Sequence, residues 1–364
     1  MEFKINRANF EKTLNSIVKL IPPKSAHTVL QNVIIEVKEN RLNIEGTDLD
    51  IFIRKSLPCD MKKEGKVLIP GKKLLEIARE ANVEEMTFKL KELNLQINAG
   101  NAQFNIPALD YSEFPEVPSF PNQKWLSLSA GELNEMVDST IFMVSKDVSR
   151  RAMNGVLLQL KDSTLNMVTT DGARLALYRK DLNGENGELI IPPKVFDLVD
   201  VAHPEEQIEI FIEERMLGLK FSNTSIIARL IEGPYPNYES VIPKVFPGTC
   251  TIEKDIMEGA LKRVSLVSSP TIKSVKFEFS GERLLLFASS PDFGEAREEV
   301  ACLYEGEKMS IWFNAGFLLE IIRHIPGGEI LLQLTSPSTA ALIKSKSLDN
   351  LIYLLMPLRI DSYE

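Results

Sequence analysis

The chain is poor in the residues that build disulfide frameworks and metal sites. Its 364 residues include 3 cysteines and 3 histidines. Cys59, Cys250 and Cys302 are far apart, and no pair has the CxxC spacing of a zinc ligand set or a redox motif. We therefore expect no disulfides, no bound metal and no cofactor.

Long apolar runs are also missing. The longest, from Leu351 to Leu358, is too short to span a bilayer, and the N-terminal residues do not have the apolar stretch of a signal peptide. Apolar residues make up 44% of the chain and charged residues 26%, as in ordinary globular proteins. These features predict a cytoplasmic protein that does not bind membranes.

Positive charge is not in excess, because the formal net charge is −9. This value argues against a nucleic-acid binder that depends on overall electrostatic attraction. It remains compatible with a protein that collects its basic residues on one surface.

One short pattern occurs three times along the chain. It begins at Val67, at Leu189 and at Ile311, at intervals of about 122 residues, which is the size of a small domain. Each copy has an apolar run of strand length, a break at Pro, Gly or Asn, and then the spacing of a short amphipathic helix. The chain is therefore predicted to be a tandem array of three similar domains.

Proline-rich connectors mark the boundaries between these domains. The segments 107–123 and 234–247 are rich in proline and have no regular periodicity, so we expect stiff extended linkers. The resulting domains are residues 1–121, 122–247 and 248–364. The connections between predicted strands are too short for parallel crossovers, which gives an α+β fold with helices on one side of mainly antiparallel sheets.

Candidate catalytic features are weak. Asp48, Asp171 and Asp292 recur at corresponding turns, which points to turn chemistry rather than to catalysis. The segment from Gly65 to Lys73 resembles a phosphate-binding loop, but its spacing is one residue too long and it has no Ser or Thr after the lysine. The histidines do not share any ligand or nucleophile motif. We expect that the protein is not an enzyme.

Features that occur in one copy only are better candidates for function. The second copy alone extends its turn into Thr170-Asp171-Gly172-Ala173-Arg174-Leu175. The third copy alone ends in an apolar tail, in which Leu351–Leu355 reads as a strand and Pro357 prevents its continuation. Exposed apolar groups from Met356 onward would form a binding surface.

Basic residues recur on the predicted helices and at the turns beside them. Each alone is an ordinary solvated side chain, but on helices that share one side of the sheets they would line a positive surface able to contact phosphates without reading sequence. The residues predicted to line this surface, which would face DNA if the resemblance described next holds, are Lys12, Lys19, Lys24, Lys72, Lys73, Arg79, Lys146, Arg150, Lys194, Lys262, Arg263 and Arg323.

Over essentially its whole length, the sequence resembles the bacterial DNA polymerase III β subunits, the sliding clamps. The resemblance rests on the segment from Thr170 to Leu175, on Pro236-Asn237-Tyr238, on the terminal Met356-Pro357-Leu358-Arg359 and on the threefold repeat. It implies a homodimer of six similar domains around duplex DNA, with helices inside and sheets outside. Its implied partners are the replicative polymerase, the clamp loader and repair proteins, which would bind through short peptide motifs.

The resemblance also implies a groove for these peptides. By position, its residues are Met153, Thr170, Gly172, Arg174, Leu175, Pro236, Ser240, Val241, Phe317, Leu354, Met356, Pro357, Leu358 and Arg359. Gly172 would permit close approach, and Arg174 and Arg359 would donate hydrogen bonds at the rim. Ser240 departs from the family, where Arg is common, and residues 361–364 extend past the usual end. Lys24 matches a basic loop position that touches DNA.

Two alternatives stay open at this stage. A repeat scaffold would bind peptides without encircling DNA, and would be recognised as a stable monomer. An enzyme acting on phosphorylated substrates would use the turn at Gly71-Lys72-Lys73.

Overall fold

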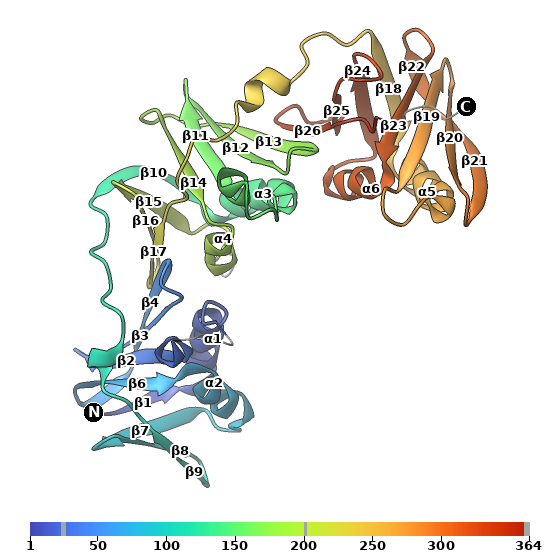
Figure 1. The fold of residues 1–364 in the computed structure, drawn as a ribbon. Helices are drawn as coiled ribbons and strands as arrows, with labels where there is room; N and C mark the ends of the chain where they lie inside the picture. Colours follow the sequence, from blue (N-terminus) through green and yellow to red (C-terminus); the bar gives the residue numbers. More distant parts are fainter. Residues whose placement is uncertain (23–26, 200–201, 360–364) are drawn as a thin grey trace. The chain divides into compact units, whose positions relative to one another are not determined.

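The computed structural model describes residues 1–22, 27–199 and 202–359. Its elements follow the threefold repeat (Figure 1). The first copy contains β1 (Glu2–Asn6), α1 (Arg7–Val18), β2 (Asn32–Lys38), β3 (Arg41–Thr47), β4 (Ile51–Pro58), β5 (Asp60–Lys63), β6 (Gly65–Pro70), α2 (Gly71–Glu80), β7 (Glu85–Lys91), β8 (Asn94–Ala99) and β9 (Ala102–Pro107).

The second and third copies repeat this order with small changes. The second has β10 (Gln123–Ser129), α3 (Ala130–Thr140), β11 (Val156–Lys161), β12 (Thr164–Thr170), β13 (Arg174–Asp181), β14 (Gly187–Ile191), α4 (Lys194–Val199), β15 (Gln207–Glu213), β16 (Met216–Phe221) and β17 (Thr224–Arg229). The third has β18 (Gly248–Glu253), α5 (Lys254–Val264), β19 (Ser274–Ser280), β20 (Arg283–Ser290), β21 (Gly294–Ala301), β22 (Leu303–Glu305), β23 (Met309–Asn314), α6 (Ala315–His324), β24 (Glu329–Leu334), β25 (Ala341–Ser345) and β26 (Leu351–Leu355).

The sheets are antiparallel, as predicted, for example where β1 pairs with β7, β11 with β12, β13 with β26, β4 with β17 and β20 with β19 and β21. The chain divides into two compact units, residues 1–134 with 191–230 and residues 135–190 with 231–364. In the first unit the sheets run β5-β1-β7-β8-β9 and β10-β15-β16-β17-β4-β3-β2-β6. In the second they run β14-β11-β12-β13-β26-β25-β24-β18-β22 and β21-β20-β19-β23.

The larger sheet of each unit is built from two copies of the repeat. β17 of the second copy pairs with β4 of the first, and β26 of the third copy pairs with β13 of the second. The compact units therefore cut through the second copy, whereas the boundaries after residues 121 and 247 remain a prediction from the repeat.

Helix starts agree with their sequence signals. In α3 the Ser129 hydroxyl accepts a hydrogen bond from the Glu132 amide at 3.3 Å, and the Glu132 carboxylate accepts one from the Ser129 amide at 3.0 Å. This reciprocal pair is a capping box, formed by the sequence Ser129-Ala130-Gly131-Glu132. In α6 the side chain of Asn314 accepts from the Phe317 amide.

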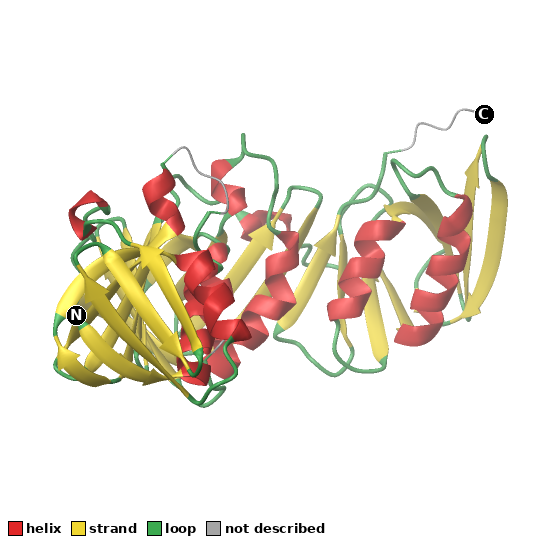
Figure 2. Ribbon diagram, turned by 90° about the horizontal axis from the view of Figure 1, so that it is seen from below, coloured by secondary structure: helices red, strands yellow, loops and turns green. Residues whose placement is uncertain are grey.

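The helices bury one face each against the sheets. α1 packs beside α2 in the first unit, and α5 beside α6 in the second (Figure 2). On α1 the buried face includes Phe10, Leu14 and Ile17, and on α5 it includes Met257, Leu261 and Val264. This 3.6-residue spacing is why the exposed faces are free to carry lysine and arginine.

The first connector departs from a plain extended linker. It contains a 3₁₀ turn at Tyr111–Glu113, and Leu109 exchanges backbone hydrogen bonds with Leu68 of β6 at 2.9 and 3.2 Å. Phe114 is buried against Ile34 and Leu68. The connector is therefore stiff because it is packed onto the sheet, and not only because it contains proline.

The segment that resembled a phosphate-binding loop is not a loop. Gly65 lies in β6, which pairs with β2 along its length up to Pro70. Its amide groups belong to a sheet, so the alternative of a phosphate-processing enzyme at this turn is not supported by the fold. Among the described residues, no helix is long and apolar enough to cross a bilayer.

Candidate functional site

A small pocket lies where β13 meets β26, entirely within the second unit. Leu175 and Leu354 stand opposite each other in the ladder and are both buried, so they form an apolar floor. The cavity has a volume of about 160 Å³. Its lining residues are Met153, Thr170, Gly172, Arg174, Leu175, Pro236, Asn237, Tyr238, Val241, Leu354 and Met356.

The turn between β12 and β13 forms one wall. The Thr170 hydroxyl donates to the Arg174 carbonyl at 2.7 Å, and Asp171 Oδ1 accepts from the amides of Ala173 and Arg174 at 2.9 and 3.0 Å. These bonds confirm the predicted turn chemistry and leave no Asp171 oxygen aimed at a substrate, since Oδ2 pairs with Arg174 at 3.0 Å. The wall is therefore rigid.

Gly172 sits at the tip of this turn with a φ of +90°, a conformation that favours glycine. A Cβ there would lie 2.5 Å from Arg150 Nη1 and 3.7 Å from Met153 Cε. The Arg150 guanidinium donates to the Asp171 carbonyl at 3.3 Å, which holds it over the turn. The glycine thus serves both the backbone geometry and the close packing at this wall.

Arg174 lines the pocket in a different way from that expected. Its side chain is 8% exposed, and its guanidinium contacts Glu320 at 2.6 Å and Asp171 at 3.0 Å and lies 4.4 Å from the ring centre of Phe317. The hydrogen-bonding groups of the guanidinium are directed at the protein. We expected Arg174 to donate hydrogen bonds at the rim of the groove. Instead, its buried side chain links β13 to α6 through Glu320.

The second connector supplies the opposite wall through a 3₁₀ turn at Tyr238–Val241. Asn237 caps this turn by accepting from the Ser240 amide at 3.3 Å. The Tyr238 hydroxyl donates to Gln159 at 2.7 Å, and burial raises the pKa of this phenol to about 12. Val241 remains 39% exposed and gives the pocket an open apolar edge.

The chain end closes the pocket beyond β26. The strand over Leu351–Leu355 is confirmed and fully buried. The Met356 amide donates to the Ala173 carbonyl at 2.9 Å, while its side chain is 37% exposed. The Leu358 amide then bonds the Trp312 carbonyl at 2.8 Å, which leads the chain away from the pocket.

The structure thus brings together most of the residues expected at the groove. The expected residues that do not line the pocket are Ser240, Phe317, Pro357, Leu358 and Arg359. Two lining residues, Asn237 and Tyr238, were not among those expected, although the Pro236-Asn237-Tyr238 motif contained the signal. The segment 361–364, whose effect on access was raised from the sequence, lies outside the described residues.

The basic residues fall into two groups. Lys12, Lys19, Lys72 and Lys146 are exposed, and no ion pair joins them to another described residue. Most others face acidic neighbours: Lys73 with Glu76, Arg79 with Glu11, Arg150 with Asp147, Lys262 and Arg323 with Glu258, and Arg263 with Glu298. Lys24 lies outside the described residues.

The side chain of Lys194 forms hydrogen bonds within the protein. Its ammonium group donates to Asp48 at 2.6 Å and to the Leu20 carbonyl at 2.8 Å. This pairing links α4 to the turn after β3 and to the end of α1. The observed role is structural, which the sequence spacing alone did not indicate.

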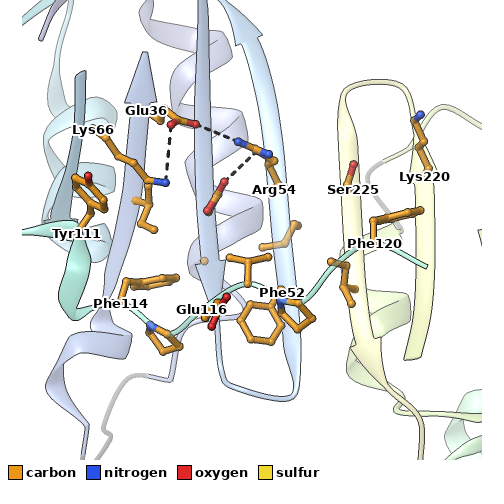
Figure 3. Close-up of a pocket in the computed structure, with 18 residues that line it drawn as sticks. Glu36, Phe52, Arg54, Lys66, Tyr111, Phe114, Glu116, Phe120, Lys220 and Ser225 are labelled. Carbon is orange, nitrogen blue, oxygen red and sulfur yellow. Dashed lines mark hydrogen bonds and ion pairs between the residues drawn. The ribbon is translucent and has the colours of Figure 1, made fainter. Parts of the chain in front are cut away.

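A larger cavity, of about 690 Å³, lies at the other joint between copies, in the first unit (Figure 3). Its floor includes Phe52 and Ile227, which stand opposite each other in β4 and β17 just as Leu175 and Leu354 do in β13 and β26. The first connector roofs it with Phe114 and Phe120.

The polar end of this cavity is an ion-pair network. Arg54 lies 3.0 Å from Glu45 and 3.1 Å from Glu36, and Lys66 lies 3.8 Å from Glu36 (Figure 3). Glu45 is buried, so Arg54 compensates its charge. Each joint between copies therefore carries a connector-covered pocket, one small and apolar, the other large and charged at one end.

Comparison with known proteins gives one consistent answer. Models of the N-terminal, central and C-terminal domains of the DNA polymerase III beta subunit match residues 1–118, 127–237 and 239–359. The beta sliding clamp of Chlamydia pneumoniae is 28% identical, with 99% of each chain covered, and that of Pseudomonas putida is 26% identical, with 99% of this chain and all of the relative covered.

Solved structures agree. The sliding clamp of Pseudomonas aeruginosa, determined with griselimycin bound, superimposes with a TM-score of 0.95 at 25% identity. The DNA polymerase III beta subunit of Thermotoga maritima gives a TM-score of 0.92 at 26% identity. In both cases 99% of this chain and 100% of the other are covered.

Proposed function

Because the chain belongs to the DNA polymerase III beta subunit family, the sliding clamps, we propose that two copies close around duplex DNA and tether the replicative polymerase to it. Members of this family are processivity factors without catalytic activity, which confirms the prediction that the protein is not an enzyme. We place its work in the cytoplasm, where bacterial DNA is replicated.

The observation that carries the proposal is that two of three equivalent strand pairings between copies are made within the chain, whereas the third is not. The last strand of the second copy pairs with β4, and the last strand of the third copy pairs with β13, the counterpart of β4. By the same rule, the last strand of the first copy, β9, would pair with β21. Both are edge strands of their sheets in the described chain.

Pairing of β9 with β21 requires a second chain. When two copies join head to tail in this way, β9 and β21 of each chain are both paired. A closed set of such head-to-tail contacts is a ring. Six repeated domains would then form the ring, and β9 and β21 would no longer be exposed as sheet edges.

The ring would hold DNA by enclosure rather than by affinity. The exposed Lys12, Lys19, Lys72 and Lys146 lie on or beside helices, and in our proposal the helices face the duplex. Contacts of this kind neutralise phosphates without reading bases. The overall charge of −9 disfavours binding to the outer surface.

The pocket at β13 and β26 would hold the partners. Its volume of about 160 Å³ suits one or two bulky apolar side chains, and its open edge at Val241 and Met356 allows an extended segment to enter. We propose that the polymerase, the clamp loader and repair proteins each present a short motif with a glutamine and apolar residues here.

A test of the whole proposal measures retention on nicked circular DNA and on the same DNA after linearisation, with a clamp loader present. Enclosure predicts long retention on circles and rapid loss from free ends. Equal loss from both substrates would contradict it and would favour a scaffold that binds peptides without encircling DNA.

A further inference from the structure

Lys55 is a buried cation that forms no hydrogen bond or ion pair with any described residue. It lies in β4 opposite Thr224 of β17, and only 7% of its surface is exposed. No described residue forms a hydrogen bond or ion pair with its ammonium group, and its neighbours Lys12 and Lys19 are also positive. Burying such a group without compensation is costly, and the nearby charge of Glu206 offsets it only in part, because the pKa of Lys55 is still lowered to about 8.

A polar cavity of about 320 Å³ surrounds this lysine, within the first unit. One wall is α1, which contributes Lys12 and the buried hydroxyl groups of Thr13 and Ser16. The other walls come from the turn between β16 and β17 and from residues 202–206. The remaining lining residues are Asn9, Leu57, Ala202, His203, Glu206, Phe221, Ser222, Asn223 and Thr224.

Glu206 adds a second unsatisfied group to the same cavity. Its Oε1 atom is buried and lacks a hydrogen-bond partner among the described residues. The residue is held in place through its backbone, because its carbonyl accepts from the Ala130 amide at 2.8 Å and its amide donates to the His203 carbonyl at 2.9 Å. The charge of Glu206 raises the pKa of Lys55 against the larger effect of burial, but no hydrogen bond or ion pair joins the two side chains in the part of the chain that the structure describes.

The second copy shows that the fold does not require this arrangement. Phe52 and Leu175 occupy equivalent positions, since they stand opposite Thr47 and Thr170 in matching hairpins. Three residues further on, the counterpart of Lys55 is Tyr178, whose hydroxyl bonds Glu135 at 2.8 Å. Tyr178 therefore has a hydrogen-bond partner within the chain, whereas Lys55 has none among the described residues.

Electrostatics favours an anion in the cavity. Burial, followed by repulsion from Lys12, lowers the pKa of Lys55 to about 8, so the side chain is still mainly charged at neutral pH. Lys12, Lys19 and Lys55 together outweigh Glu206. An ordinary carboxylate or sulfate would satisfy the lysine but would leave the Glu206 oxygen facing another acceptor.

We propose that the cavity formed by Lys55, Lys12, Thr13 and Glu206 binds a phosphate group that carries a P–OH, either as inorganic phosphate or as the terminal monoester of a nucleotide. The anionic oxygens accept from the lysines and from the hydroxyl of Thr13, and the P–OH donates to Glu206. A phosphodiester of DNA does not have this hydroxyl, so the site is distinct from contacts with the duplex backbone.

Isothermal titration of the full-length protein tests the proposal, with inorganic phosphate, a nucleoside monophosphate and sulfate as separate titrants at constant ionic strength. We expect phosphate or the monophosphate to bind at one site per chain, and at least tenfold more tightly than sulfate. The tighter of the two phosphates identifies the source. Lys55→Met should reduce the affinity at least tenfold, whereas Lys220→Met, which removes an exposed lysine of the same unit, should leave it unchanged.

Glu206→Gln separates the P–OH contact from simple charge attraction. The amide can donate as well as accept, so this variant should bind sulfate and phosphate with affinities within about threefold of each other. Absence of phosphate binding at millimolar concentration in the native protein would overturn the proposal. Equal binding of phosphate and sulfate by the native protein, or equal losses in Lys55→Met and Lys220→Met, would overturn it as well.

Discussion

Leu175 on β13 and Leu354 on β26 stand directly opposite each other, although 179 positions separate them in the chain, and together they make the floor of the candidate peptide pocket. The first joint between copies places Phe52 and Ile227 in the same relationship. The pockets are therefore products of the joints themselves. At each place where strands of two copies pair, β4 with β17 and β13 with β26, a proline-rich connector passes beside the paired strands. A cavity lies between the connector and the sheet.

Met356 gives the most direct test of the small pocket. Replacing it with alanine removes a side chain that lines the cavity and is 37% exposed, so partner peptides lose apolar contact while the fold keeps its core. We expect binding to weaken by about 1–2 kcal/mol, or roughly five- to thirtyfold. Fluorescence anisotropy with a labelled peptide containing glutamine and bulky apolar residues measures this change.

Val245→Ala is the matched control for Met356→Ala. Val245 is 72% exposed on the second connector, which forms the opposite wall, but it does not line the pocket, so its truncation should not alter peptide affinity. Unchanged binding in Met356→Ala, or equal weakening in both variants, would remove Met356 from the site.

Gly172 tests the rigid wall. Gly172→Ala introduces a Cβ at a φ of +90° and only 2.5 Å from Arg150 Nη1, so both backbone strain and a displaced guanidinium result. We expect a loss of about 1–2 kcal/mol in the free energy of unfolding and weaker peptide binding. Urea denaturation and anisotropy give the two quantities.

Gly233→Ala is its control, because Gly233 has a φ of +113° with no atom within 4 Å of the added Cβ. This change should cost stability through the backbone alone and leave peptide binding intact. If it weakened peptides as much as Gly172→Ala does, strain rather than contact with Arg150 would explain the effect.

Local features of this chain were readable from the sequence because they depend on near neighbours. The capping box of Ser129 and Glu132 and the Thr170-Asp171 turn are satisfied within a few residues, so their geometry is set by spacing alone. The segregation of helices and antiparallel strands follows in the same way from periodicity and short connections.

Features that depend on distant partners were not readable. Lys194 reads as one more helix lysine until the fold brings Asp48 to within 2.6 Å of it. The sequence suggested that Arg174 donates hydrogen bonds at the rim of the groove. In the fold its guanidinium instead donates to Glu320, which is 146 positions away. The repeat itself gave no sign that strands of one copy would pair with strands of the next.

The edge strand β9 offers a test of dimer formation. Phe104, partly buried on this strand, should contact β21 of a second chain, which carries Glu295, Glu298 and Glu299. Phe104→Glu removes apolar contact and adds like charge, so we expect the dimer to dissociate at least tenfold more readily. Sedimentation velocity over a range of concentrations measures the dissociation constant.

The control for Phe104→Glu is Leu93→Glu, since Leu93 is 52% exposed in the turn between β7 and β8 rather than on the edge. It should keep the native dissociation constant. Identical sedimentation of the Phe104→Glu variant and the native protein would contradict pairing through β9.

Lys55 makes stability depend on pH in a predictable direction. Its pKa is about 8 in the folded chain and near 10.5 when unfolded, so between these values the unfolded chain binds more protons and folding becomes more favourable as pH rises. Below pH 8 the buried charge costs the folded state about 3 kcal/mol in the absence of an anion, because the pKa is lowered from 10.5 to about 8 and each pKa unit corresponds to about 1.4 kcal/mol. The Lys55→Met variant does not have this cost. Its free energy of unfolding should therefore exceed that of the native protein by this amount at pH 7, and the difference should vanish near pH 10.5.

Urea unfolding of both proteins in a buffer without phosphate, at intervals from pH 7 to 10.5, measures this difference. It isolates the contribution of Lys55 because the other titrating groups cancel. A difference that stays constant across this range would mean that Lys55 keeps its ordinary pKa in the fold, and the cavity would then have no uncompensated charge for an anion to neutralise.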